Sequence, residues 1–374
     1  MAVVTRYFST AAAGAGDGTT WANRAQLVSG ATWSTVITGF SFAGSDSLEV
    51  RIGPGTHSPT AAMTSALFAN APSLANPIIF HGCDSSGNLL ESPDPDWVSA
   101  QAEFSTAALP VIATTTAIQT STLANSFWRL IYFTASGSIA NSVLSGGNFD
   151  WIGILISGSS ANNAGMSSPS LITNSFIKIT GTAFDTGVTS PVKMDNVRID
   201  GTAATGSGTR RGLSTSSAGH NVSRITVIGC AGGGILAAAG SATRSSYYSQ
   251  CMLINNGTYG ILCNATALQT VWHTITNCYF SGNGTYGIDA NGSRTIASNN
   301  RLRDSTTADF ANFGNYPTSY NYTTDSDNAT EFVDSAAGDY RIKNTAAIWG
   351  KGYGAGDQPA GGAIGGGNLN GGFQ

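Results

Sequence analysis

Charge is the property that this sequence has least of. Among its 374 residues, 17 are Lys or Arg and 21 are Asp or Glu, so charged residues make up 10% of the chain and the formal net charge is -4. An average soluble protein has about 25% charged residues. Because no basic stripe is present, the sequence argues against nucleic acid as a partner. It also has no apolar run long enough to cross a bilayer, so we expect no membrane insertion.

Cysteine is also scarce. The five cysteines are odd in number and fall in no C-x-x-C or Cys/His spacing. This pattern favours small apolar side chains buried in a core, and it leaves a disulfide or a metal role as the alternative. The four histidines are too dispersed in the sequence to indicate a metal site, so we expect neither a metal nor a cofactor. The cysteines are Cys83, Cys230, Cys251, Cys263 and Cys278.

What the sequence does contain is one short pattern that returns seven times between Phe127 and Phe310. Each copy has a hydrophobic residue, any residue and a second hydrophobic residue before a small or turn residue, and the copies follow at steps of 20 to 28 residues. A second strand signal, Asn-Gly-Thr-Tyr-Gly-Ile, occurs at residues 256–261 and again at 283–288. The copies begin at Ile131, Ile154, Ile177, Val197, Ile225, Cys251 and Cys278, with a degraded eighth at Asn300.

The length of this repeat decides the fold class. A unit of this size that alternates with period two has room for two or three short strands and their turns, but for no helix. The sequence therefore predicts an all-β parallel β-helix, a solenoid whose successive turns stack about 4.8 Å apart. Stacking also explains the scarcity of charge, since like charges repeated in a column would face one another. The predicted inward residues are Ile177, Ile179, Val197, Ile199, Ile225, Val227, Leu253 and Phe280.

We expect a single stack rather than several globular domains, because a solenoid grows in one dimension. Residues 1–30 are predicted to form an N-terminal cap, in which residues 3–8 are a strand and Thr20 caps a short helix from Trp21 through Leu27. Residues 31–345 form the parallel β-helix. Residues 346–374 are a Gly-rich C-terminal tail, either disordered or laid as an extended arm on a neighbouring subunit.

Four stretches of the chain carry a family resemblance. They are residues 7–10 with 16–21, residues 48–57, the Asn/Gly-rich repeats, and residues 339–350. In this order they resemble the right-handed parallel β-helix superfamily typified by pectate and pectin lyases, and among its members the phage virion proteins. The resemblance implies a right-handed solenoid. It does not choose an activity, because the same scaffold carries lyases, hydrolases, phage tailspikes and non-enzymatic surface proteins.

In the polysaccharide lyases of that superfamily, the substrate lies along an outward strand face beside basic residues and calcium-binding carboxylates. The resemblance therefore makes Lys178, Arg198 and Asp200 the candidate substrate-binding residues, with Asp195 and His220 among the residues on nearby turns. In a lyase, Arg198 or Lys178 would be the base and the aspartates would bind calcium. A solvated Arg198–Asp200 surface pair is the commoner explanation. As a hydrolase pair, Asp195 and Asp200 are weak, because five positions give them opposite parity in one strand.

The outward columns also contain an apolar cluster that spans three repeats. On a neutral polar surface such a cluster indicates a covered area, either under a loop of the same chain or under another subunit. We favour a subunit, and a trimer would suit an elongated molecule. The predicted interface residues are Ile228, Met252, Ile254 and Tyr279.

Scarce charge and stacked β-strands suit a protein that persists outside cells, whereas residues 1–7 lack the charged region and apolar core of a secretory signal. A phage virion component satisfies both observations, because it is made in the host cytoplasm and released by lysis. We therefore expect a non-enzymatic structural protein of the virion surface, a capsid decoration or head-spike protein or a tail spike or fibre, that adheres to host surface glycans. The expected partners are further copies of the chain, virion proteins such as the major capsid protein, and host polysaccharide. The alternatives are an extracellular lyase or depolymerase of acidic polysaccharide and a bacterial surface adhesin.

Overall fold

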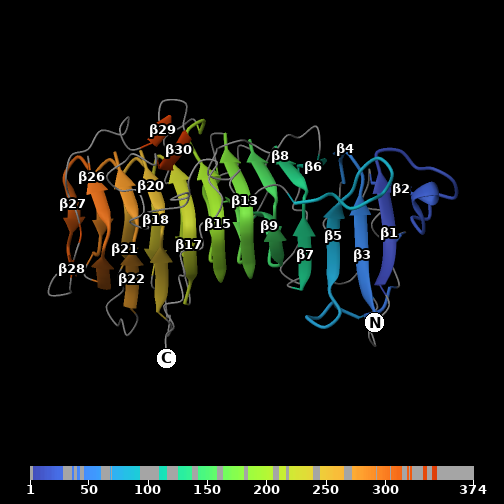
Figure 1. Ribbon diagram of the computed structural model, residues 1–374, viewed down its shortest axis with the longest axis horizontal. Helices are drawn as coiled ribbons and strands as arrows, with labels where there is room; N and C mark the ends of the chain where they lie inside the picture. Colours follow the sequence, from blue (N-terminus) through green and yellow to red (C-terminus); the bar gives the residue numbers. More distant parts are fainter. Residues whose placement is uncertain are drawn as a thin grey trace.

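The computed structural model is an elongated parallel β-solenoid whose strands lie side by side along its long axis (Figure 1). The chain runs from one end of the stack, drawn in blue, to the other, drawn in orange. The secondary structure is almost entirely β, as the sequence predicts. The structure describes residues 3–27, 36–37, 40–42, 46–59, 68, 70–92, 109–115, 125–136, 142–157, 163–180, 184–204, 210–215, 219–238, 245–264, 272–291, 293–303, 305–313, 318–319, 321, 332–334 and 339–342.

Each turn of the chain, here called a coil, places its first strand on one face of the solenoid, face 1. The inward side chains of face 1 stack in register from Val50 to Ala297. Phe80 and Trp128 of adjacent coils stack with their ring centroids 3.9 Å apart. The strands of face 1 are β3 (Ser47–Ile52), β5 (Ile78–Gly82), β7 (Ser126–Arg129), β10 (Asn148–Asp150), the first halves of β13 (Leu171–Ile179), β15 (Lys193–Asp200) and β17 (Asn221–Ile228), then β19 (Ser246–Ser249), β22 (Trp272–Thr276), β25 (Arg294–Ser298) and β28 (Thr318–Ser319), preceded by β1 (Val3–Ser9) with its short partner β2 (Ala25–Gln26).

The second strand of each coil lies on face 2, where the inward column runs from Ile112 to Leu302. The predicted inward set lies here and is at most 1% exposed, so that prediction is confirmed. The strands of face 2 are β4 (Gly55–His57), β6 (Pro110–Thr114), β8 (Tyr132–Ala135), β11 (Gly153–Ile156), the second halves of β13, β15 and β17, then β20 (Met252–Ile254), β23 (Tyr279–Ser281) and β26 (Arg301–Arg303).

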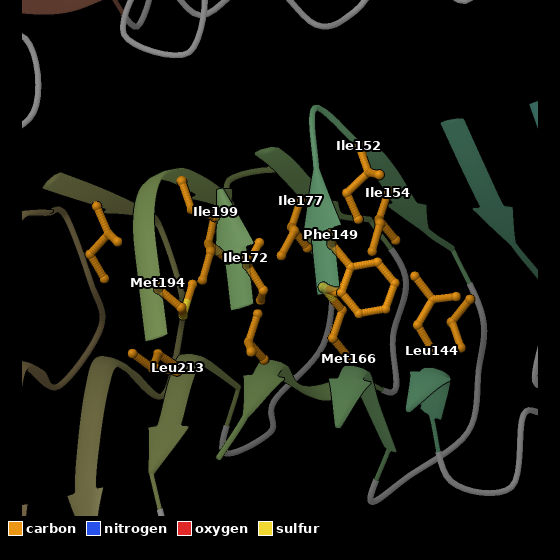
Figure 2. Close-up of a cluster of buried hydrophobic side chains, with 14 of the residues drawn as sticks. Leu144, Phe149, Ile152, Ile154, Met166, Ile172, Ile177, Met194, Ile199 and Leu213 are labelled. Atoms are coloured by element: carbon orange, nitrogen blue, oxygen red, sulfur yellow. The ribbon is translucent and has the colours of Figure 1, made fainter. Parts of the chain in front are cut away.

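Face 3 is a separate eight-stranded sheet whose inward column runs from Leu144 to Phe310. Figure 2 shows how Phe149, Ile154 and Met166, one from each face, point into the same interior. The strands of face 3 are β9 (Ser142–Ser145), β12 (Asn163–Ser167), β14 (Phe184–Thr189), β16 (Arg211–Thr215), β18 (Gly233–Ala238), β21 (Tyr259–Asn264), β24 (Tyr286–Asp289) and β27 (Ala308–Ala311). Two further strands, β29 (Phe332–Asp334) and β30 (Asp339–Ile342), pair antiparallel with each other.

In each coil from β7 to β25, a single residue in the left-handed backbone region makes the corner between face 1 and face 2. Asparagine, which tolerates this conformation best after glycine, stands at half of these corners. Because β13, β15 and β17 continue through the corner, faces 1 and 2 form one 20-stranded sheet. The corner residues are Leu130, Trp151, Asn174, Asn196, Arg224, Gln250, Asn277 and Asn299, with φ between 46° and 55°.

A column of glycines, one from each of six adjacent strands, runs along face 3. At each position, a Cβ atom would meet the backbone oxygen of the next coil and the large inward side chain of face 2. At Gly234, for example, a Cβ would lie 2.5 Å from the oxygen of Gly260 and 3.0 Å from Leu253. The missing side chains therefore make room for the core residues of face 2. The column consists of Gly165, Gly187, Gly212, Gly234, Gly260 and Gly287.

The N-terminal prediction is partly wrong. The strand over residues 3–8 is confirmed as β1, and the Thr20 side chain accepts a hydrogen bond from the Asn23 N–H at 3.2 Å, as a helix cap would. The helix through Leu27 does not form, however, and only a 3₁₀ turn (η1, Trp21–Asn23) follows Thr20. The next residues leave the turn in an extended conformation, because pairing of β2 with β1 buries Ala25 in the core. The Gly-rich tail at 346–374 lies outside the described residues.

The register between coils also differs from the expected one at two steps. Phe133, not Ile131, lies beside Ile154, and Ile177 lies beside Ile199 rather than Val197. The corners explain both shifts, because the coils align at their left-handed residues and not at the first residue of the hydrophobic pattern. Each shift is two residues, so inward residues stay inward but outward residues move to the neighbouring column.

All five cysteines are buried free thiols, as the sequence favours. Cys251 and Cys278 lie one above the other in adjacent coils, and the Cys251 N–H donates to the Cys278 sulfur at 3.4 Å. Burial raises the pKa of Cys83, Cys230 and Cys263 to about 12, so their thiols stay protonated. These cysteines therefore act as small apolar core residues.

Candidate functional site

The predicted cluster of Lys178, Arg198 and Asp200 lies on face 2, but its members are not equally accessible. Lys178 and Asp200 occupy the same outward column in adjacent coils, whereas Arg198 lies in the next column. Arg198 is 4% exposed, its guanidinium lies 5.8 Å from the ring centroid of Phe176, and its Nη2 donates to Asp200 Oδ2 at 3.0 Å. The Arg198–Asp200 pair predicted from the sequence therefore exists, but it is largely buried and not solvated.

Asp200 is held in its charged form. Burial pushes the pKa of Asp200 upwards, but the hydrogen bonds from Thr202 and the charge of Arg198 outweigh burial and leave the pKa below its usual value. Thr202 donates from both its backbone N–H, at 3.0 Å, and its hydroxyl, at 2.6 Å. The Asp200 carboxylate is thus hydrogen-bonded by residues of its own strand and of the turn that follows, as expected of a structural ion pair.

The four residues predicted to form a subunit interface, Ile228, Met252, Ile254 and Tyr279, lie in adjacent outward columns of face 2, and each is at most 1% exposed within the single chain. The covered area that the sequence predicts is therefore present, and its burial needs no second subunit. The periodic pattern shows which side of a strand faces outward, but not whether water or protein lies there. These residues supply no argument for a subunit interface.

Asp195 and Asp200 lie on different faces, because the corner at Asn196 separates them. Both carboxylates point outward, so the parity expected for one continuous strand does not apply here. Asp195 Oδ1 accepts hydrogen bonds from Ser223 Oγ and Arg224 Nε, both at 2.8 Å, and its second oxygen pairs with Arg224 Nη2. Although burial raises it, the pKa of Asp195 is lowered overall by these donors.

The outward surface of face 1 is more open than that of face 2. Its side chains form two rows that run from coil to coil, and every member is at least partly exposed. Tyr247 is 53% exposed, which is unusual for an aromatic residue within a strand. The first row is Phe127, Asn148, Leu171, Lys193, Asn221, Tyr247, Thr274 and Ile296. The second row is Arg129, Asp150, Thr173, Asp195, Ser223, Ser249, Thr276 and Ser298.

One hollow is set into this face, over β5, β7, β10 and the start of β13. It has a volume of about 240 Å³ and is lined by the side chains of Ile79, Phe127 and Leu171 on the apolar side and by Arg129, Asn148 and Asp150 on the polar side. Drug-sized ligands occupy pockets of about 300–1,000 Å³, so this hollow suits a single small ring. An apolar wall with a few convergent polar groups is the usual composition of such a site.

The polar side of the hollow is a loose network. Asp150 Oδ1 accepts from Thr173 Oγ1 at 2.7 Å and from Asn174 Nδ2 at 3.0 Å. Its second oxygen lies 3.5 Å from Arg129 Nε, too far for a strong hydrogen bond, and the two side chains are 33% and 43% exposed. Arg129 Nη2 donates to Ser92 Oγ at 2.6 Å. One carboxylate oxygen and part of one guanidinium therefore face solvent together.

Asp195 is unsuited as the proton donor of a glycosidase pair with Asp150. Asp150 and Asp195 lie two coils apart in one row, roughly 9.6 Å between their strands. Inverting hydrolases place their carboxylates about 6.5–9.5 Å apart, but one of them must have a raised pKa in order to donate a proton. The pKa of Asp195 is lowered instead. Among the residues that the structure describes, no three His, Cys, Asp or Glu side chains are grouped so that they could hold a metal ion.

Sequence reasoning missed face 1 because the second-strand pattern is the more regular one. A signal was nevertheless present, since Phe127-Trp-Arg129 and Asn148-Phe-Asp150 each alternate directly before a corner residue.

No helix in the described part of the chain is long and apolar enough to span a membrane.

Comparisons of the chain with protein-family models, with curated proteins and with solved structures find no match. The parallel β-solenoid is therefore shown by the structure alone, and no match supports the pectate lyase-like superfamily or the virion type that the sequence suggests.

Proposed function

We propose that this chain is a non-enzymatic structural protein of a virion surface, of the pectate lyase-like β-helix type, that adheres to host glycans through face 1. The single observation that carries the adhesive part is the hollow beside Phe127, Arg129 and Asp150, on the open face of a rigid stack. Structural and adhesive roles both need an extended scaffold that presents a fixed surface, which a parallel solenoid provides.

The chemistry of the hollow matches a sugar ring. A pyranose has apolar C–H faces that pack on Phe127 and Leu171, and hydroxyl groups that donate to a carboxylate and accept from a guanidinium. Asp150 and Arg129 supply one of each at the same rim. Because the two opposite charges lie side by side, the site favours a neutral sugar over an acidic one. The open rows of face 1 extend beyond the hollow, so the rest of a glycan chain has room along the stack.

The lyase alternative finds no support in these contacts. A base must reach the substrate proton, but Arg198 is 4% exposed and bonded to Asp200. Lys178, the other candidate base, is partly exposed, so it is the residue to test for lyase activity. A calcium site needs several oxygen ligands, yet Asp200 is already occupied by Arg198 and Thr202. We therefore place the glycan contact on face 1 and assign no catalytic residue.

The virion assignment rests on composition and architecture together. Charged residues make up 10% of the chain, and every described coil hydrogen-bonds to its neighbours in parallel register. Such a stack buries a continuous core and exposes few charges, which suits prolonged exposure outside the cell. Capsid decoration, head-spike, tail-spike and fibre proteins all meet this description.

A glycan microarray with the purified full-length chain tests the adhesive role. We expect binding to neutral bacterial surface oligosaccharides, a loss of at least tenfold in Phe127→Ala and in Asp150→Asn, and no loss in the matched control Lys178→Ala on face 2. Reaction products measured on acidic polysaccharides should show no new unsaturated or reducing ends. If Lys178→Ala abolished binding while Phe127→Ala did not, the site would have to be moved to face 2.

Immunogold labelling tests the location. Antibodies against the purified chain should label particles in lysates of the producing culture. Labelling confined to intact cell surfaces would support the bacterial adhesin instead.

A further inference from the structure

Two histidines that are far apart in the sequence share one interior column. His220 directly precedes β17, and its backbone N–H donates to Ser246 Oγ at 3.3 Å in the next coil. Ser246 on β19 pairs in turn with His273 on β22, and His273 pairs with Thr295 on β25. The two imidazoles therefore lie two coils apart on the inner side of face 1, with one serine between them.

Most of the polar atoms of this pair have no hydrogen-bond partner. His220 is 5% exposed and His273 is 3% exposed. His220 Nδ1 donates to the Pro191 carbonyl, which leaves Nε2 as the acceptor nitrogen. His220 Nε2 and both ring nitrogens of His273 find no partner among the described residues. Buried polar atoms are rarely left without a partner, so three in one column need an explanation.

No counter-ion lies at the column within the described residues. Other ionisable side chains buried in these coils are Tyr248 on β19, Cys251, Cys263 on β21, Cys278 after β22 and Asp289 at the end of β24. Burial raises the pKa of Tyr248, of Cys251 and of Cys263, so these groups are neutral in acid. Asp289 Oδ1 accepts from Asn291 and from Asn312, and it forms no ion pair with either histidine.

We propose that the His220–His273 column makes the coils from β17 to β25 an acid-labile segment, which opens locally at mildly acidic pH while the histidine-free coils from β7 to β15 stay closed. A proton on either imidazole would bury a positive charge without a partner, and a second proton would add repulsion within the same column. Opening of the segment exposes both rings to water and removes both penalties. Local opening of this kind is expected of a stack in which each coil contacts only its neighbours.

The pKa values of the two histidines give the direction in which the stability of the segment changes with pH, and the pH range in which it changes. Burial, with a smaller effect of the nearby His220, lowers the pKa of His273 to about 4, and burial also lowers the pKa of His220. An exposed histidine has a pKa of about 6.5. The segment therefore has its full stability above pH ~6.5 and loses it as the pH falls towards 4. For His273 alone, the opening equilibrium rises about tenfold per pH unit, or about 300-fold in all.

Two N-terminal histidines serve as internal comparisons. His57 and His81 are also buried, and burial lowers the pKa of each. Each keeps one bonded ring nitrogen, since His57 Nε2 contacts the Gly53 carbonyl at 2.9 Å and the Leu90 backbone bonds His81. They also lie on different faces, His57 on β4 and His81 on β5, so they do not stack.

Hydrogen exchange read by mass spectrometry at pH 7.5 and pH 5.0, corrected for the intrinsic rate, tests the proposal on the full-length chain. We expect peptides from β19, β22 and β25 to lose at least tenfold in protection at pH 5.0, and peptides from β7, β10 and β11 to lose much less. His273→Gln and His273→Phe, which carry no proton at either pH, should abolish most of that loss. His81→Gln, the matched control, should leave it unchanged. An unchanged acid response in both His273 variants would overturn the proposal.

Imidazole titration of the wild-type chain by NMR covers the case in which the His273 variants do not fold. A His273 pKa near 4 supports the proposal, whereas a value near 6.5 contradicts it.

Discussion

Asn256 donates two hydrogen bonds to one oxygen of Asn283 in the next coil. Its backbone N–H lies 3.2 Å from Asn283 Oδ1 and its side-chain Nδ2 lies 3.0 Å from the same atom. Asn283 Nδ2 in turn donates to the Leu253 carbonyl at 2.9 Å, and Asn256 Oδ1 accepts from the Cys230 N–H at 3.1 Å. Both asparagines are at most 1% exposed. The turn between face 2 and face 3 is therefore held by a buried amide ladder along the stack.

The ladder predicts a large effect for Asn283→Ala. Removal of the amide leaves the Asn256 backbone N–H and the Leu253 carbonyl without their partner. Asn256 Nδ2 loses one of its two acceptors and keeps the Val227 carbonyl at 3.2 Å. Each buried group left unsatisfied costs about 1–3 kcal/mol. We expect a loss of about 3–5 kcal/mol in unfolding free energy, measured by urea denaturation. The control is Asn264→Ala, because Asn264 is exposed and bonds Asn291 in a ladder open to water. Equal effects of the two substitutions would show that burial of the ladder does not matter.

The glycine column predicts that Gly260→Ala is destabilising. A Cβ at this position would lie 2.6 Å from the backbone oxygen of Gly287, which cannot move without shifting the next coil. Overpacking of this kind costs about 1–3 kcal/mol. Ser214→Ala is the control, since Ser214 faces outward on the same sheet and is partly exposed. Thermal melting followed by circular dichroism checks both variants, and no shift for Gly260→Ala would mean that the coils have room to separate.

The sequence predicts those features of the fold that follow from the alternation of apolar and polar residues. Period-two patterns identify which residues face inward, so the core columns and the stacking of Cys251 on Cys278 were predictable. The alignment of coils was not, because it depends on the sign of φ at the corners, and residues such as Leu130 and Trp151 carry no sequence signal for that conformation. The burial of Met252 was not predictable either, because alternation does not tell whether the outward side of a strand is covered. His220 and His273 look dispersed until two coils are known to separate them.

The corner column predicts a stabilising substitution. Gln250 has a φ of 53°, a conformation that costs a typical non-glycine residue about 1–2 kcal/mol and asparagine less. The corner residues of the next two coils are Asn277 and Asn299, and Asn299 Nδ2 donates to Asn277 Oδ1 at 2.5 Å. Gln250→Asn should therefore raise the unfolding free energy by about 0.5–1 kcal/mol, measured by urea denaturation. Gln250→Ala keeps the strain and removes no hydrogen bond seen among the described residues, so it should change the unfolding free energy little. A loss of stability in Gln250→Asn would contradict this explanation.

Because the thiols are buried, we expect them to be unreactive in the folded protein. Only a thiolate attacks a disulfide reagent, and burial raises the pKa of Cys83, Cys230 and Cys263 to about 12 and that of Cys251 well above its usual value. At pH 8 the closed chain should therefore release almost no chromophore from an aromatic disulfide reagent over an hour, whereas all five cysteines should react in denaturant. Cys251→Ser is the informative variant, because its hydroxyl is more polar than the thiol and would weaken the core at β20 without changing the other four sites. Fast reaction of any native thiol would show that the surrounding coils open far more often than a continuous dry interior allows.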